Sequence, residues 1–346
     1  MNSSPDKPSR RKFLTAAGAA VLAPHELLAQ SPEKREYLDK FKFDTNVIRR
    51  AIRTPETEDF FKTRPPKEII KRIIEQYRIE PDWALLADTE YDPKELKENI
   101  VLAGIKSAGG ISEISLFSQE KPNVGVLSDA DRLDITYGQI IPYGKKEAIM
   151  PGHIFDILVQ VEGVEGFKDP QYDAAVARIP NVRFNPKSVA HFPPRLTTTD
   201  IHGSFVAIAG YRPDSELGRT GVKMYGGIAF EVTKPLYDYF EPIFEVPEEK
   251  KWLSTSLVVI SKSSEGVPVE HFAKKNDPVR PVGGMSGGIA AMIGDDQVRD
   301  GYQRFGYLWG AAAFEHNGEA YTAYFLHGPE IMQRNIRRIK SSLLQR

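Results

Sequence analysis

The feature that most constrains the fold is a series of short apolar runs between about residues 111 and 327. Gly, Pro, Asn and Asp separate these runs, as in DITYGQIIPYG, IFDILVQVEG, GSFVAIAGYRP, GGIAFEVTKP and STSLVVISKS. Many short strands with turn residues between them are typical of an all-β barrel or sandwich. Asn317-Gly318 adds a strong hairpin signal. We therefore expect a mostly β fold here.

The segments on either side of this region have helical patterns. Residues 30–64 are charged and predict an irregular lead-in, whereas PPKEIIKRIIEQYRI places four isoleucines on one helical face. Asp92 suits an N-cap, with Pro93 at the first helical position. SAGGISEISLFSQEKPNVG indicates a hinge, and the C-terminal tail indicates a further helix. We expect three parts: 1–29, a lead-in and helical section at 30–110, and a β domain at 111–346.

The N-terminus has the layout of an export signal. Arg10 and Arg11 lie in SRRKFLTAAGAAVLAP and precede an apolar run, and Ala29 ends a small-residue cleavage site. This order is similar to the twin-arginine signal peptide. The apolar run is shorter than the about 20 residues that span a bilayer, so no stable membrane anchor is expected. The prediction is a mature protein that starts near Gln30, uses the twin-arginine export machinery and is periplasmic or secreted.

Composition narrows the chemistry. The 346 residues include no cysteine, which excludes disulfides, a thiol nucleophile and a cysteine metal site. A net charge of −1 gives no support to nucleic acid as a partner. The sequence has no HExxH motif, no P-loop and no GxGxxG strand–helix unit. We therefore expect neither a metal nor a cofactor.

Residues 282–292, VGGMSGGIAAM, surround Ser286 with four glycines. Such a segment is either a flexible loop or a tight turn whose backbone N–H groups converge on a small charged species. A reactive serine needs a base, a group that orients the base, and donors for the oxyanion. His153 follows an apolar run at a Gly-His turn, and Asp173 directly precedes the buried-looking segment AAVARI. Each alone is an ordinary turn or capping residue.

In this order the motifs resemble those of trypsin-like serine peptidases, which have the chymotrypsin fold. The matching residues are His153, Asp173, AGYRP, GMSGG and LWGA, over about residues 130–327. The resemblance implies two six-stranded-type β-barrels and a C-terminal helix. It implies a serine endopeptidase acting on polypeptides, with Ser286 as nucleophile, His153 as general base and Asp173 as orienting acid. The N–H groups of Gly284 and Ser286 would form the oxyanion hole, and Trp309 and Gly310 would line the substrate pocket.

Two alternatives remain open at this stage. PGHIFD together with GMSGG is also similar to the sporulation-factor-IVB group of serine peptidases, which keeps His153 and Ser286 but makes Asp173 less secure. If Asp173 does not orient His153, another acid such as Asp156 or Asp169 does so, or the site is a Ser-His dyad. Met285 stands where the trypsin-like family usually has Asp or Asn. A catalytically inactive peptidase-fold protein, acting as a binding or scaffold module, is the alternative from a different class. A reactive serine separates the enzyme from the scaffold.

Overall fold

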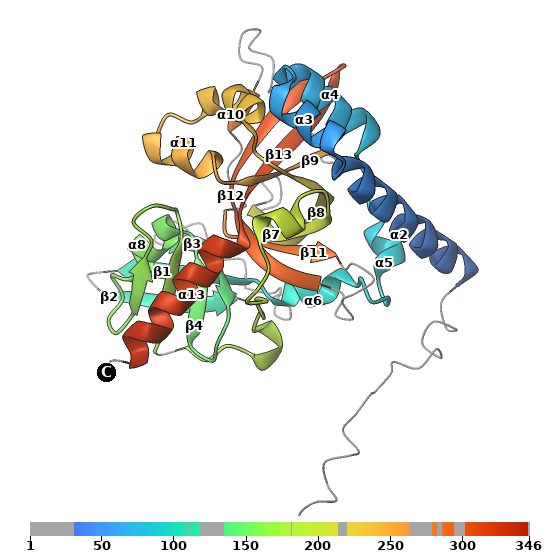
Figure 1. Cartoon of the computed structure of the whole chain (residues 1–346). Coiled ribbons are helices and arrows are strands. Elements are labelled where there is room, and N and C mark those ends of the chain that lie inside the picture. Colours follow the sequence, from blue (N-terminus) through green and yellow to red (C-terminus); the bar gives the residue numbers. More distant parts are fainter. Residues whose placement is uncertain are drawn as a thin grey trace, which may run out of the picture.

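The computed structural model describes residues 31–108, 111–117, 135–180, 182–213, 220–262, 279–281, 286–293 and 302–344. Helices come first, two antiparallel sheets follow, and a long helix ends the chain (Figure 1). The predicted signal segment 1–29 and the glycine-flanked positions Gly284 and Met285 lie outside the described residues.

The N-terminal part is more helical than its sequence indicates. Residues 30–64, expected to be irregular, contain two helices with proline at the start and a side-chain N-cap, because the hydroxyls of Ser31 and Thr54 each accept a backbone N–H. That expectation was wrong because few apolar residues mark the inner face, and tertiary burial stabilises the helix. The helices are α2 (Pro32–Ile52), α3 (Pro55–Thr63), α4 (Pro66–Gln76), α5 (Trp83–Leu86) and α6 (Pro93–Glu98).

The first sheet is open and has six strands in the order β2-β1-β3-β4-β6-β5. β1 and β2 pair in antiparallel fashion, with Ala108 opposite Ile111, so the described residues of the segment expected to be a hinge, 107–108 and 111–117, belong to the sheet. Among the described residues no pairing joins the edge strands β2 and β5. The strands are β1 (Val101–Ala108), β2 (Ile111–Phe117), β3 (Ile135–Pro142), β4 (Glu147–Met150), β5 (Glu165–Lys168) and β6 (Ala175–Arg178).

The second sheet has the order β10-β12-β11-β7-β8-β9-β13, and an additional β12–β13 pairing closes six of these strands into an antiparallel barrel. The expectation of two barrels is therefore confirmed only in part, because one six-stranded barrel is closed and the other sheet is open. The strands are β7 (Phe205–Pro213), β8 (Thr220–Glu231), β9 (Leu257–Lys262), β10 (Val279–Pro281), β11 (Ile289–Ile293), β12 (Tyr302–His316) and β13 (Glu319–His327).

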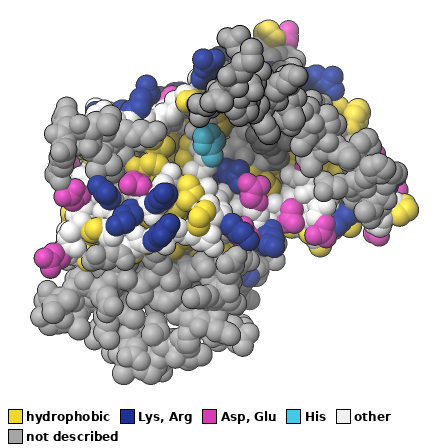
Figure 2. Space-filling model, turned by 90° about the horizontal axis from the view of Figure 1, so that it is seen from below, with side chains coloured by type: hydrophobic (Ala, Val, Ile, Leu, Met, Phe, Trp, Pro, Cys, Tyr) yellow, Lys and Arg dark blue, Asp and Glu magenta, His cyan; other side chains and the backbone are white. Residues whose placement is uncertain are grey.

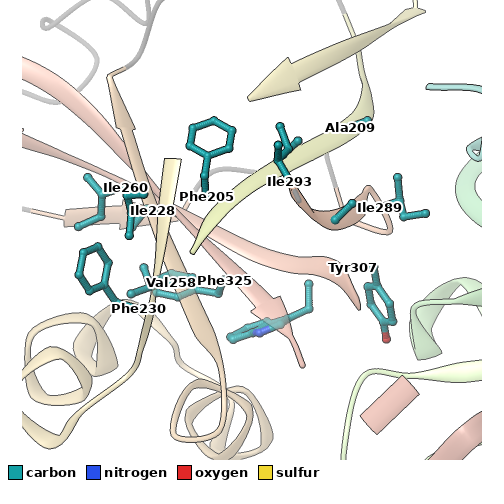
Figure 3. Close-up of a cluster of buried hydrophobic side chains, with 14 of the residues drawn as sticks. Phe205, Ala209, Ile228, Phe230, Val258, Ile260, Ile289, Ile293, Tyr307 and Phe325 are labelled. Carbon is teal, nitrogen blue, oxygen red and sulfur yellow. The ribbon is translucent and has the colours of Figure 1, made fainter. Parts of the chain in front are cut away.

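Both faces of the barrel wall are buried. One cluster takes residues from all six strands, including Val206, Ile208 and Val259, and this set fills the interior. The alternate positions of the same strands point outward, as Figure 3 shows for Phe205, Phe230 and Val258 among others. The N-terminal helices cover part of this outer face, for example where the rings of Phe41 and Phe205 lie 5.0 Å apart. The helical section is therefore packed onto the barrel.

Three further helices, α10 (Lys234–Phe240), α11 (Pro247–Leu253) and α13 (Pro329–Leu344), lie outside the strands (Figure 1). α13 contacts β5 and β6 of the first sheet and β12 of the barrel. On the face seen from below, Lys and Arg side chains gather beside hydrophobic and acidic ones (Figure 2). Within the described ranges, no helix is long and apolar enough to cross a membrane.

Candidate active site

His153 lies on a short helix that packs against the first sheet. β4 ends at Met150, Pro151 is the N-cap, and α8 (Gly152–Leu158) begins immediately after it. The sequence suggested a strand here, but the apolar side chains of α8 pack into the core of the first sheet at helical spacing. His153 therefore lies in the first turn of a helix, with its side chain 52% exposed. The rigid core fixes the backbone, while the imidazole reaches solvent.

Asp173 meets His153 through both carboxylate oxygens. It lies in the connection between β5 and β6, is buried, and accepts hydrogen bonds from the His153 backbone N–H (2.9 Å) and from Nδ1 (2.7 Å). An ionised carboxylate can only accept, so Nδ1 carries the hydrogen and the Nε2 lone pair is free to take a proton. A Cβ at Gly152 would lie 3.0 Å from the same carboxylate. The glycine before the histidine therefore leaves room for the acid.

The charge state of Asp173 follows from two opposing effects. Burial raises the pKa of the carboxyl, but the hydrogen bonds and the charge interaction with His153 outweigh it, so the pKa lies below its ordinary value of 3.8. Asp173 is therefore ionised at neutral pH. A buried carboxylate of this kind stabilises an imidazolium that forms beside it.

The two alternative acids have other partners. Asp156, on α8, pairs with Lys168, and Asp169 pairs with Arg334 at 2.6 Å. Asp173 is thus the acid that contacts His153, whereas the carboxylates of Asp156 and Asp169 form ion pairs with other residues.

Ser286 comes from the barrel and lies beside the segment that carries His153. The turn before β11 is fixed by hydrogen bonds from Gly287 N–H to Leu308 O (2.7 Å) and from Leu308 N–H to Gly288 O (2.8 Å). Gly287 has φ of +91°, and a Cβ there would lie 3.1 Å from Cδ of Pro151. The two sheets therefore meet at the serine turn.

The Ser286 hydroxyl itself is buried and has no hydrogen-bond partner among the described residues. The hydrogen bond that a nucleophile and its general base would make is thus not formed between Ser286 and His153 in this conformation. Catalytic hydrogen bonds are often long or poorly aligned before substrate binds.

The expected pocket residues lie in the barrel wall. Trp309 is buried, donates from Nε1 to the hydroxyl of Ser256 at 2.8 Å, and packs against the Phe244 ring at 5.2 Å. Gly310 follows it where the β12–β13 register shifts. Trp309 is part of the buried core, and lining of a substrate pocket by these two residues stays a prediction.

Sequence reasoning missed the residues that join the two sheets around this site. The Tyr307 hydroxyl on β12 donates to the backbone O of Asp173. The Gln139 amide on β3 bridges the Tyr211 backbone on β7, donating to its O at 3.0 Å and accepting from its N–H at 2.8 Å. Tyr307 stands two residues before Trp309, but nothing local in the sequence marks either contact.

Across the described segments, no group of three or more His, Asp or Glu side chains is arranged to hold a metal ion.

A comparison with known protein families finds no match, and a comparison with curated proteins finds no relative. Among solved structures, the chain is similar to the thermostable serine protease AL20 from an extremophilic microorganism, with a TM-score of 0.33, 9% identity, and coverage of 70% of this chain and 96% of that one. It is also similar to the active form of the Rv3671c protease from M. tuberculosis, with a TM-score of 0.29, 12% identity, and coverage of 75% and 87%. At these low scores the proposed function has to rest on the chain's own residues.

Proposed function

We propose that this chain is a serine endopeptidase with Ser286 as nucleophile, His153 as general base and Asp173 as orienting acid. One observation carries the proposal: a buried carboxylate binds both the backbone N–H and Nδ1 of a half-exposed histidine. This arrangement fixes the imidazole and leaves Nε2 available. The packing of Gly287 against Pro151 supports it by bringing the serine turn to the same place.

The reaction follows from these positions. Nε2 of His153 removes the proton of the Ser286 hydroxyl as Oγ attacks the carbonyl carbon of a peptide bond, and Asp173 stabilises the imidazolium. The Ser286 N–H would donate to the oxyanion, together with that of Gly284, and each such donor is worth about 3 kcal/mol. The imidazolium then protonates the leaving amine as the C–N bond breaks. Water hydrolyses the acyl-enzyme by the same sequence of proton transfers, restoring the serine.

The test is covalent labelling of the serine. A fluorophosphonate probe should label the wild-type protein at Ser286, and Ser286→Ala should abolish both labelling and peptide hydrolysis. Ser254→Ala is the matched control, because Ser254 is an exposed serine whose hydroxyl bonds only to its own helix turn. Labelling that survives in Ser286→Ala would refute the assignment of the nucleophile.

A second candidate is a catalytically inactive binding module with a peptidase-like fold. The observation that favours it is the Ser286 hydroxyl, which is buried and has no hydrogen-bond partner in the part of the chain that the structure describes. Under this hypothesis, wild-type protein neither reacts with the probe nor hydrolyses peptide or ester substrates, although it binds polypeptide. Probe labelling of the wild type eliminates this candidate.

A further inference from the structure

The C-terminal helix is attached to the connection that carries Asp173. Nη2 of Arg334, on α13, donates to Oδ2 of Asp169 at 2.6 Å, and Nη1 lies 3.4 Å from Oε1 of Gln171. The guanidinium also lies over the ring of Tyr172, 4.8 Å from its centroid. One side chain of the helix thus contacts three residues of the five that run from Asp169 to Asp173.

Inside this connection, backbone hydrogen bonds transmit the position of Asp169 to Asp173. The Asp169 N–H donates to Ala174 O at 2.7 Å, and the Ala174 N–H donates to Tyr172 O at 2.7 Å. The other carboxylate oxygen of Asp169 accepts the Gln171 N–H at 2.9 Å. Ala174, directly after Asp173, is therefore bonded to the backbone of Asp169, and Gln171, two residues before Asp173, is bonded to its carboxylate.

The ion pair matters because its acid is buried. The side chain of Asp169 is 1% exposed and that of Arg334 is 32% exposed. A buried carboxylate without its partner is costly, so loss of Arg334 favours a rearrangement that takes Asp169 towards water. Since β5 is an edge strand of an open sheet, it has strand pairing on one side only to oppose this rearrangement.

We propose that Arg334 is a positioning residue that holds Asp173 against His153, an inference that rests on the proposed function. It acts through Asp169 and touches neither substrate nor the reacting atoms. A planar guanidinium suits this position, because it can bind a carboxylate, reach an amide and stack on an aromatic ring at once.

Other polar and titratable groups also face Asp173. They come from every element packed against it: His153 on α8, Tyr307 on β12, His327 on β13 and Glu249 on α11, with Lys168 and Asp169 in its own hairpin. Only Asp169 among them is hydrogen-bonded to Arg334.

The experiment compares Arg334→Met with wild-type protein by two readouts. The Nδ1 proton of His153 is followed by NMR and assigned by its absence in His153→Gln. In Arg334→Met, this resonance should shift or be lost through exchange with water. The kcat should fall by about 10²-fold, the cost of a displacement of about 1 Å, with KM nearly unchanged. An unchanged resonance and an unchanged kcat would overturn the proposal.

Two further variants complete the test. Arg337→Met is the matched control, because Arg337 is exposed on the same helix and its Nε bonds to Gln333 O within that helix; it should match wild type. Arg334→Lys keeps the charge but cannot reproduce the planar contacts, so it should show a smaller change of the same kind. If Arg334→Met does not fold, Arg334→Lys takes its place as the test variant. A wild-type resonance and a wild-type kcat in Arg334→Lys would then refute the proposal. If wild-type protein is inactive, the proposed function fails, while the proton resonance still tests the positioning.

Discussion

The barrel and the open sheet hold their strands in different ways. In the barrel, each of the six closed strands has a paired neighbour on both sides, and both faces of the wall are buried. In the open sheet, β5 has only β6 beside it, and its residues are largely exposed. The barrel carries Ser286, and the open sheet carries His153 and Asp173.

The difference shows where the candidate site depends on side chains. Strand pairing and packing on both faces fix the serine side of the site. The acid lies next to an edge strand, so its place depends on hydrogen bonds from other elements: Tyr307 from the barrel, Arg334 from α13, and Trp252 from α11, whose Nε1 donates to Gln171 O at 2.9 Å. We expect substitutions on the open-sheet side of the site to change activity. Substitutions at the junction between the two sheets, where Gln139 bonds to Tyr211, should change stability.

The largest expected effect is that of Asp173→Asn, which replaces the acid on the open-sheet side. An amide at this position can donate to Nδ1, which favours the wrong imidazole tautomer. We expect the fold to be retained and kcat to fall by about 10⁴-fold, measured with a peptide or ester substrate.

The matched control is Asp156→Asn, which removes a carboxylate on α8 whose partner is Lys168. It should keep wild-type kcat. If Asp173→Asn is nearly silent while Ser286→Ala is inactive, the site works as a Ser-His dyad, and the open sheet supplies only the base.

Much of the fold was predictable from local patterns. The mostly β region, the helices at α4 and α6, the C-terminal helix and the Asn317-Gly318 hairpin are all present; both turn residues have positive φ. Closure was not predictable, because whether β13 also pairs with β9, or β5 stays at an edge, depends on contacts between distant segments. α8 was misassigned because a short apolar run fits a buried strand and a buried helix equally well.

The candidate site was also predictable in part. The ordered motifs that resemble those of trypsin-like serine peptidases suggested His153 and Asp173, and the side chains of these two residues are in contact. Their catalytic function stays a prediction. Arg334 is separated by 165 residues from Asp169, so no window of sequence indicates that pair. Gln139 and Tyr211 likewise meet only when the two sheets pack together.

A second prediction concerns this junction between the sheets. Gln139→Leu keeps the approximate volume but leaves the N–H and O of Tyr211 buried without the two hydrogen bonds of the amide. Each of the two unsatisfied groups costs about 1–3 kcal/mol, so the free energy of unfolding should fall by about 2–6 kcal/mol in a denaturant titration.

Gln160→Leu is the control for this change. Gln160 is exposed after α8, and water can replace the bond from its Nε2 to Asp156 O. Its effect should stay within about 0.5 kcal/mol, as for ordinary surface positions. Equal effects of the two substitutions would mean that the amide bridge does not hold the sheets together.

The smallest expected effect separates the two regions by their response to acid. His327 ends β13 in the barrel wall, fully buried among the rings of Tyr172, Trp252, Tyr307 and Trp309, and neither ring nitrogen has a hydrogen-bond partner among the described residues. Burial lowers the pKa of His327 from 6.5 to about 3. Between these values the unfolded chain binds a proton that the folded protein does not, so stability is lost as the pH falls.

Protonation of His327 in the unfolded chain should therefore lower the free energy of unfolding of the wild-type protein by about 2 kcal/mol between pH 7 and pH 5. The loss is about 1.36 kcal/mol for each pH unit below the pKa of the unfolded chain. His327→Phe keeps an aromatic ring in the same surroundings and has nothing to protonate, so its loss over that range should be smaller by this amount. The contribution of His202, whose pKa burial lowers to about 4, is present in both proteins and cancels in the comparison.

His191→Phe, at an exposed position, is the control and should follow the wild-type curve. Denaturant titrations at pH 5 and pH 7 measure the difference; parallel losses in His327→Phe and wild type would show that the acid sensitivity does not come from the barrel histidine.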